Sequence, residues 1–266
     1  MERKILMNCS DNRNQNSNQN SNQNSNQDNV NAGKSKAEGK LKPNRTHVRT
    51  LILVAMFSAL AYVVMLVFHI KVSFLTFELK DAIMTIGAMI CGPVYSVVMS
   101  LLTSLIEMVT VSDTGFYGFI MNFLASVAFT LPASLIYKYK RNIFGALAGT
   151  LTSVFTMTAV MLVANLIVTP YYYKMDVAGV AQMIPTLLLP FNLTKAMLNA
   201  GVVLLLYKPI SQAVKRTGLI PMENGEQTRT FKRGTTIITV SLSLVLITAS
   251  VLIFLLVLGG SITFWS

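Results

Sequence analysis

The sequence contains few of the residues from which catalytic and metal-binding sites are built. Its 266 residues include only two histidines and two cysteines. Cys9 and Cys91 indicate no disulfide framework. No Gly-rich phosphate loop, no cluster of His and Cys ligands and no Ser/His/Asp set is recognisable. We therefore expect no catalytic residue, no metal site and no bound cofactor, and we do not interpret the chain as an enzyme.

Charged residues are also scarce, at 12% of the chain, whereas hydrophobic residues make up 53% and the mean hydropathy is +0.55. These values indicate an integral membrane protein rather than a soluble domain. The net charge of +11 does not indicate a nucleic-acid partner, because most of the excess lies in the N-terminal tail and in loops. No cleavable signal peptide is recognisable, since MERKILM is followed by a polar tract.

A polar tail is followed by a series of apolar runs long enough for membrane helices. We expect helices at residues 48–68, 81–91, 94–111, 116–137, 142–168, 186–207 and 235–258. The stretches 69–80 and 169–185 are expected to be external segments. The expected regions are a disordered Asn/Gln-rich tail (1–47), a membrane domain (48–210), a basic linker (211–234) and an additional transmembrane helix (235–258).

Basic residues cluster before the first helix, between the fourth and fifth, and between the sixth and seventh. All three positions fall on one side of the membrane if every helix crosses it. The positive-inside rule places that side in the cytoplasm. We therefore expect a multi-pass protein of the cell membrane with a cytoplasmic N-terminus.

The stretch PFNLTKAMLNA, residues 190–200, carries polar groups inside an apolar helix. Asn192, Lys195 and Asn199 share one helix face through their i, i+3, i+7 spacing. A lysine at the centre of a membrane helix costs roughly 2.5–3.5 kcal/mol. This face is either a solute-binding face or a snorkelling lysine with two interhelical amide bonds.

Other polar residues in or beside the helices gather toward the same outer half. The whole set is Glu78, Asp81, Glu107, Asn122, Asn165, Asn192 and Lys195. Convergence of a few hydrogen-bonding groups among apolar helices is typical of a binding pocket, here one open to the outside. Tyr171–Tyr173, beside Asn165, are interpreted as an interfacial aromatic belt rather than as a stacking platform.

Two pairs of small residues could allow close helix packing. Ala55 and Ala59 form an A-x-x-x-A pair in the first helix, and Gly145 and Gly149 form a similar pair in the fifth. Each pair could serve a partner helix or packing within the chain; the second alternative is favoured for the glycines.

Four stretches together resemble a known family. They are VAMFSALAYVVM, FLTFELKDAIMTIGAMICGPVYSVV, GFYGFIMNFLASVAFTLPASLIYK and LLLPFNLTKAMLNAGVVLLLYKPI. The chain is identified as a member of the S components of energy-coupling factor (ECF) vitamin transporters, with most resemblance to the riboflavin-specific group. The resemblance covers about residues 48–210.

The resemblance implies an all-α polytopic membrane protein with a six-helix core, to which this chain adds a C-terminal transmembrane helix. Such a protein captures riboflavin from outside and docks on a T component that carries two ABC-type ATPases. Ala55 and Ala59 match the docking surface of the family. The positions that match flavin contacts are Asn192, Lys195, Asn165, Phe74, Leu75, Thr76 and Glu78.

One helix departs from the riboflavin-specific pattern. Where a Lys-Asn pair and a later His are common, this chain has Thr103, Ser104 and Glu107. FMN, folate and pantothenate therefore stay open as alternative cargoes. A membrane sensor or scaffold, in which the polar face is structural, is the alternative from another class. A flavin-binding protein would be yellow on purification, whereas a scaffold would be colourless.

Overall fold

The computed structural model describes residues 45–72, 75–111, 114–216 and 233–257. The chain divides into two compact units, Met1–His47 and Val48–Ser266. The elements described below lie in the second unit, apart from the first residues of the first helix. Residues 1–44 of the expected disordered tail, most of the expected linker and Phe74 lie outside the described residues, whereas residues 45–47 of that tail belong to the first helix.

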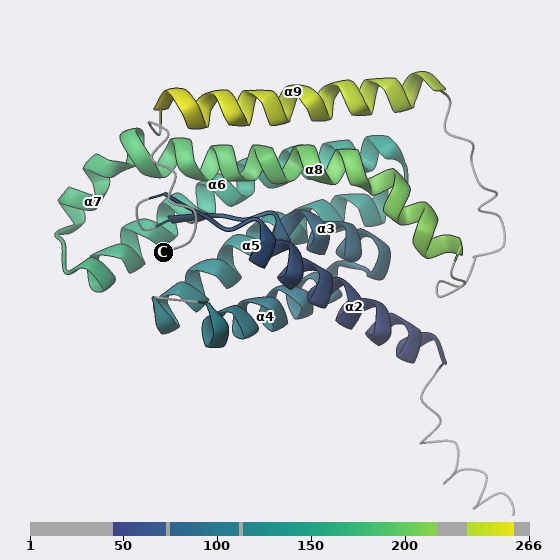
Figure 1. Ribbon diagram of the computed structural model, residues 1–266, viewed down its shortest axis with the longest axis horizontal. Helices are drawn as coiled ribbons and strands as arrows, with labels where there is room; N and C mark the ends of the chain where they lie inside the picture. Colours follow the sequence, from purple (N-terminus) through teal and green to yellow (C-terminus); the bar gives the residue numbers. More distant parts are fainter. Residues whose placement is uncertain (1–44, 73–74, 112–113, 217–232, 258–266) are drawn as a thin grey trace, which may run out of the picture. The chain divides into compact units, whose positions relative to one another are not determined.

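The described part of the second unit is mostly helical (Figure 1). Its elements are α2 (Arg45–Val67), β1 (Ile70–Val72), β2 (Leu75–Phe77), α3 (Lys80–Cys91), α4 (Pro93–Thr110), α5 (Gly115–Tyr139), α6 (Ile143–Tyr173), α7 (Val177–Met183), the π-helical turn η1 (Ile184–Leu188), α8 (Leu189–Arg216) and α9 (Arg233–Val257). Every helix expected from the sequence is present. The differences lie in the segments between them.

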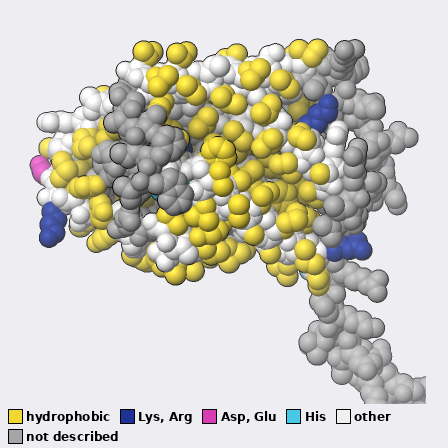
Figure 2. Space-filling view, in the orientation of Figure 1, with side chains coloured by type: hydrophobic (Ala, Val, Ile, Leu, Met, Phe, Trp, Pro, Cys, Tyr) yellow, Lys and Arg dark blue, Asp and Glu magenta, His cyan; other side chains and the backbone are white. Residues whose placement is uncertain are grey.

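Among the described residues, six helices are long and apolar enough to cross a membrane, by length and composition. They are α2, α4, α5, α6, the combined stretch from α7 to α8, and α9. Side chains on their outer faces are apolar, and hydrophobic atoms cover much of the face seen in Figure 2. In a bilayer these side chains would contact lipid, so their exposure needs no protein partner.

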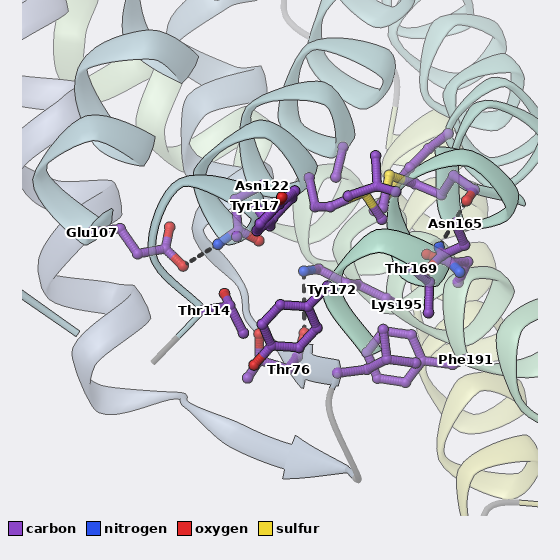
Figure 3. Close-up of a pocket in the computed structure, with 18 of the residues that line it drawn as sticks. Thr76, Glu107, Thr114, Tyr117, Asn122, Asn165, Thr169, Tyr172, Phe191 and Lys195 are labelled. Carbon is purple, nitrogen blue, oxygen red and sulfur yellow. Dashed lines mark hydrogen bonds between the residues drawn. The ribbon is translucent and has the colours of Figure 1, made fainter. Parts of the chain in front are cut away.

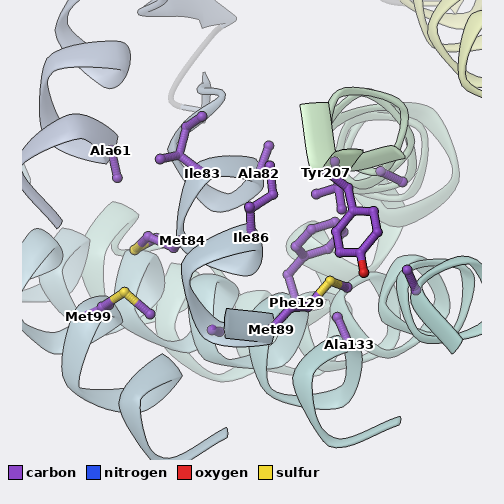
Figure 4. Packing of buried hydrophobic residues seen from close by; sticks show 14 of the residues in the cluster. Ala61, Ala82, Ile83, Met84, Ile86, Met89, Met99, Phe129, Ala133 and Tyr207 are labelled. Carbon is purple, nitrogen blue, oxygen red and sulfur yellow. The ribbon is translucent and has the colours of Figure 1, made fainter. Parts of the chain in front are cut away.

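Helix α3 is different, because its 12 residues are too few to span a bilayer as a helix. Residues Lys80–Met89 are all buried, and α3 packs against α4, α5 and α8. A helix that is buried all round belongs to a protein core. Figure 4 shows its apolar side chains Ala82, Ile83, Met84 and Ile86 among those of the neighbouring helices. The hydrophobic core of the membrane domain therefore surrounds α3.

Segment 69–80, expected to be an external loop, instead contains a β-hairpin. β1 and β2 pair antiparallel, with Ile70 opposite Phe77 and Val72 opposite Leu75. The alternation of apolar and polar residues in HIKVSFLTF fits the period of a strand. A two-stranded hairpin of this size is marginal in water. The loop prediction was wrong because packing against helices stabilises strands that are too short to be recognised alone.

Segment 169–185, expected to be an external segment between two helices, is itself mostly helical. Helix α6 continues through Pro170 and ends at Tyr173, where Lys174 adopts a left-handed conformation with φ 51°. Asp176 then caps α7, accepting a hydrogen bond from the backbone N of Val177 at 2.8 Å. Pro170 removes one backbone donor but does not end the helix here. The expected helix end before Thr169 was therefore too early.

The two pairs of small residues have different environments. Gly145 and Gly149 are buried, and a Cβ on Gly149 would lie 2.8 Å from the backbone oxygen of Ala133 in α5. This close approach confirms packing within the chain as the role of the glycine pair. Ala55 and Ala59 on α2 are exposed. The alanine pair can therefore contact a partner outside the described residues.

Candidate functional site

A cavity of about 340 Å³ lies between the hairpin and helices α4, α5, α6 and α8 (Figure 3). Its volume falls within the roughly 300–1,000 Å³ range of small-molecule sites. Polar side chains in its wall come from every one of these elements: Thr76, Glu107, Asn122, Asn165, Asn192 and Lys195. Aromatic rings fill much of the remaining wall: Tyr117, Tyr172, Tyr173 and Phe191. The mixture of rings with a few polar groups is typical of a site for a flat, partly polar molecule.

Most of the site residues expected from the sequence line this cavity. The lining ones are Leu75, Thr76, Asn165, Asn192 and Lys195. Glu78 is not among the lining residues; it is 1% exposed and bonded to the lining Lys195 and Thr76. Residues 117 and 119 positions apart in the chain thus meet because the hairpin packs against α8.

Lys195 is held by the hairpin. Its Nζ lies 3.1 Å from the backbone oxygen of Thr76 and 3.5 Å from Glu78 Oε2. The side chain is 5% exposed. These contacts favour the interpretation of the polar face as part of a pocket wall over that of a lysine extended alone to the membrane surface. An ammonium has three N–H donors, so one is still available beyond these two partners.

Glu78 is the centre of a buried ion cluster. Its Oε2 lies 2.7 Å from Lys80 Nζ and 3.5 Å from Lys195 Nζ, while its Oε1 accepts from Thr76 Oγ1 at 3.2 Å. Lys80 also donates to Glu107. Burial alone would raise the pKa of Glu78, but the attraction of the two lysines outweighs it and holds the pKa below its ordinary value. Buried charges survive in a fold only when paired in this way.

Asn199, the third polar residue on the α8 face, has a structural role. Its Oδ1 accepts from the backbone N of Ala82 at 2.9 Å, and its Nδ2 donates to the backbone oxygen of Glu78 at 2.9 Å. The first N–H groups of a helix have no partner within it. Asn199 of α8 therefore supplies hydrogen-bond partners for the backbone at the start of α3.

Asn165 and Asn192, the two amides predicted as site residues, differ in the hydrogen bonds that they can still make. Asn165 is bonded at both ends, since its Nδ2 donates to the Met161 oxygen at 2.7 Å and its Oδ1 accepts from Thr169 at 3.0 Å. Asn192 Nδ2 donates to the Leu188 oxygen at 2.8 Å. Among the described residues, none donates to Asn192 Oδ1. The cavity wall therefore offers a free acceptor at Asn192 and a free donor at Lys195.

Glu107 and Asn122, which the sequence placed among the polar residues converging on a pocket, line the cavity. They bond one another, with Asn122 Nδ2 2.5 Å from Glu107 Oε1. Sequence reasoning missed the aromatic lining residues. Tyr172 lines the cavity as well, although the sequence favoured a membrane belt for it. Phe191 gave no signal, because an apolar residue in an apolar helix has no distinguishing pattern.

Asp81 does not belong to the cavity wall. Its Oδ1 accepts a hydrogen bond from Ser126 Oγ at 2.6 Å, deep between α3 and α5.

In the part of the chain that the structure describes, no group of three or more His, Cys, Asp or Glu side chains could hold a metal ion.

Membrane-length helices around a cavity with a few placed polar groups define a multi-pass membrane protein that binds a solute. The chain belongs to the family described as "ECF transporter, substrate-specific component", whose pattern matches residues 49–210. It is thus the substrate-binding subunit of an ECF transporter and works with the rest of that transporter. Helix α9 lies outside the matched residues.

Two similar proteins support this assignment. The curated protein "Riboflavin transporter RibU" of Staphylococcus aureus (strain TCH60) is 29% identical over 188 residues, which cover 67% of this chain and 98% of that protein. A solved structure, "Structure and mechanism of the S component of a bacterial ECF transporter", matches with a TM-score of 0.55 and 29% identity, covering 64% of this chain and 99% of that one. The expected fold class, an S-component core with an added helix, is confirmed.

The ion cluster predicts that Glu78→Gln lowers the stability of the protein. The change removes one charge and leaves Lys195 buried without a carboxylate, and breaking a buried pair typically costs about 3–5 kcal/mol. Thermal unfolding in detergent measures the loss. Asp176→Asn is the matched control, because Asp176 is exposed and asparagine is an equally good helix cap. Equal melting temperatures for the Glu78 variant and the wild type would show that the cluster does not stabilise the fold.

Proposed function

We propose that this chain captures riboflavin from outside the cell for ATP-driven uptake. The observation that carries the proposal is its 29% identity to a curated riboflavin transporter across 98% of that protein, together with a cavity whose lining residues all lie within the family-matched residues 49–210. The proposal assigns no chemical step to the chain: the vitamin is a transported ligand, neither a cofactor nor a substrate of catalysis.

The chemistry of the cavity wall suits a flavin. Riboflavin has a flat ring system whose imide edge carries two carbonyl oxygens and an N–H group. Lys195 has a donor available for a carbonyl, and Asn192 has an acceptor available for the N–H. Tyr117, Tyr172 and Phe191 supply aromatic surface for the rings. We infer that the imide edge is held by α8, with the ring system between the aromatic side chains.

The charges of the wall favour an uncharged cargo. Lys195 is already paired with Glu78, and Glu107 presents a carboxylate to the same cavity. The phosphate of FMN, or the carboxylates of folate and pantothenate, would have to enter beside Glu107. Burying an anion without its own cation is costly. We therefore infer that riboflavin binds in preference to these alternatives.

Substitution of the two α8 residues tests this binding mode. Lys195→Ala and Asn192→Ala should each weaken riboflavin binding by about 1–3 kcal/mol, the usual loss when a buried partner is left unpaired. Quenching of riboflavin fluorescence measures the affinity, and the melting temperature is recorded in parallel because Lys195 also contacts Glu78. Leu189→Ala, an exposed position on the same helix, is the control.

Two results would contradict the proposal. Wild-type affinity in both variants would remove Lys195 and Asn192 from the binding site. A wild-type protein that is colourless and binds no riboflavin would favour another vitamin or a non-transporting sensor. Competition with FMN, folate and pantothenate identifies the cargo in that case.

We propose further that the exposed alanines of α2 dock on an ECF T component, which carries two ABC-type ATPase subunits. Ala55 and Ala59 are exposed on one side of α2, whereas Phe57 and Ala61 are buried against the core. In lipid, apolar helices associate through close van der Waals contact, which small residues permit. Neither alanine lines the cavity. Docking and ligand binding therefore use separate surfaces of the chain.

This separation predicts that Ala55→Leu combined with Ala59→Leu abolishes riboflavin uptake while leaving the affinity for riboflavin unchanged. Bulky side chains hold a partner helix away, and contact energy falls steeply with a small gap. Uptake in cells and co-purification of the T component are measured beside the binding assay. Ala148→Leu with Thr152→Leu is the control, since these exposed residues of α6 have the same spacing. Normal uptake in the α2 variant would exclude the docking role.

We propose that the N-terminus is cytoplasmic and that the cavity opens to the outside. The cavity is lined by residues at the end of α6 and the start of α5, such as Tyr172 and Tyr117. Lys138, Lys140 and Arg141 lie at the opposite ends of these two helices, at the turn between α5 and α6. The positive-inside rule assigns that turn to the cytoplasm.

Cysteine labelling tests this orientation. In a background with Cys9 and Cys91 replaced by serine, Ala178→Cys in α7 should react with a membrane-impermeant maleimide in intact cells. Lys140→Cys should react only after the cells are opened. The reverse pattern would invert the topology and place the cavity mouth inside.

A further inference from the structure

Helix α9 contacts residues that adjoin the cavity wall, although it lies outside the matched family region. The family pattern ends at residue 210, and the similar curated protein is covered to 98% of its length by an alignment that spans 67% of this chain. The S-component core is thus complete without α9. In this chain, however, α9 runs alongside α8, the helix that carries Lys195 (Figure 1).

The approach of α9 to α8 is close in the middle of both helices. A Cβ on Gly201 would lie 2.6 Å from Ile247 Cγ1 and 3.1 Å from the backbone oxygen of Ser243, so the glycine permits the contact. Ser250 Oγ donates a hydrogen bond to the backbone oxygen of Thr194 at 3.0 Å. Thr194 directly precedes Lys195. A helix that serves only as a lipid anchor requires no such bond.

An aromatic series continues from α9 into the cavity wall. Phe254 meets the ring of Phe77 edge-on, with centroids 5.2 Å apart and an interplanar angle of 87°. Phe77 in turn lies against Phe191, with centroids 4.5 Å apart. Phe191 lines the cavity, and Phe77 follows Thr76, whose backbone oxygen accepts from Lys195. Three rings therefore connect α9, the hairpin and α8.

The hairpin needs support from outside itself. Its strands have three residues each, and an isolated pair of strands is marginally stable at best. Leu75 and Thr76 nevertheless form part of the cavity wall. Movement of the hairpin away from α8 would therefore open one wall of the cavity and give a bound molecule a way out. Anything that fixes the hairpin on α8 slows that escape.

We propose that α9 is a brace that holds the β1–β2 hairpin against α8 and prolongs retention of the bound solute, with Phe254 and Ser250 as positioning residues. Phe254 acts through Phe77 on the hairpin, and Ser250 acts through the backbone of α8 beside Lys195. The opposite face of α9, which includes Leu244, Leu252 and Leu255, is exposed and apolar and suits lipid. The part of the proposal that concerns solute retention rests on riboflavin being the ligand.

The first test needs no ligand. Hydrogen exchange of peptides that cover residues 70–77 is compared in detergent for full-length wild type, Phe254→Ala and Leu252→Ala. The Phe254 variant should exchange faster in the hairpin, and the lipid-facing Leu252 variant should match the wild type. Equal hairpin exchange in all three proteins would overturn the brace.

The second test measures riboflavin kinetics on the same proteins. Phe254→Ala should raise the dissociation rate roughly two- to tenfold, the range expected for one aromatic pair, while the association rate changes little. Phe254→Tyr, which keeps the ring, should restore slow dissociation. Ser250→Ala should give a smaller increase in the same direction. Should Phe254→Ala fail to fold, Phe254→Leu and Ser250→Ala carry both measurements.

These outcomes test the role of α9 independently of the identity of the ligand. Faster hairpin exchange with unchanged riboflavin dissociation would overturn the role in retention. A wild type that does not bind riboflavin would contradict the proposed cargo, and the exchange experiment would still decide whether α9 fixes the hairpin. An equal rise of the dissociation rate in Leu252→Ala would indicate general loosening of the helix and would overturn the assignment to Phe254.

Discussion

The membrane domain depends on the pairing of Glu78 with Lys80 and Lys195. A carboxylate and two ammonium groups are buried within a protein whose surroundings are lipid, and each would be expensive alone. Their pairing fixes three parts of the chain at once: the end of the hairpin, the start of α3 and the middle of α8. Lys80 extends the cluster to Glu107 on α4. The charges thus define where these elements meet, while apolar packing alone would allow them to slide.

This constraint explains how a helix too short to span the bilayer can sit at the centre of the fold. Helix α3 starts at Lys80, and its first turn is held by the ion cluster and by Asn199 from α8. Its remaining side chains are surrounded by α4, α5 and α8. Lipid does not have to accommodate the start of α3, because protein groups satisfy it. The hairpin occupies the space beyond its first turn and supplies one wall of the cavity.

The sequence predicted the helices, the family and much of the cavity wall, and the reason is physical. A charge or amide within an apolar run is rare in membrane helices, so Lys195, Asn192 and Asn165 could each be identified from the sequence as candidate site residues. The hairpin and α7 could not be predicted from the sequence, because their stability comes from contacts with distant residues. For the same reason Phe191 could not be identified as part of a site. Glu78 was expected to touch the ligand, but the structure places it outside the cavity lining, where its role is to hold Lys195.

The second function of Lys195 changes the meaning of an alanine substitution there. From the sequence, removal of a buried charge should relieve a cost of insertion. In the structure Lys195 also neutralises Glu78, so the substitution leaves that carboxylate with Lys80 as its only buried lysine among the described residues. Because Lys80 is the nearer partner, at 2.7 Å against 3.5 Å, Glu78 keeps its stronger ion pair. The hairpin loses its bond to α8 at Thr76, however, and is then held to α8 by the aromatic contact between Phe77 and Phe191 and by the bond from Asn199 Nδ2 to the backbone oxygen of Glu78. Lys195 therefore serves both ligand binding and the positioning of the hairpin. When Lys195 is replaced, α9 can still hold the hairpin against α8.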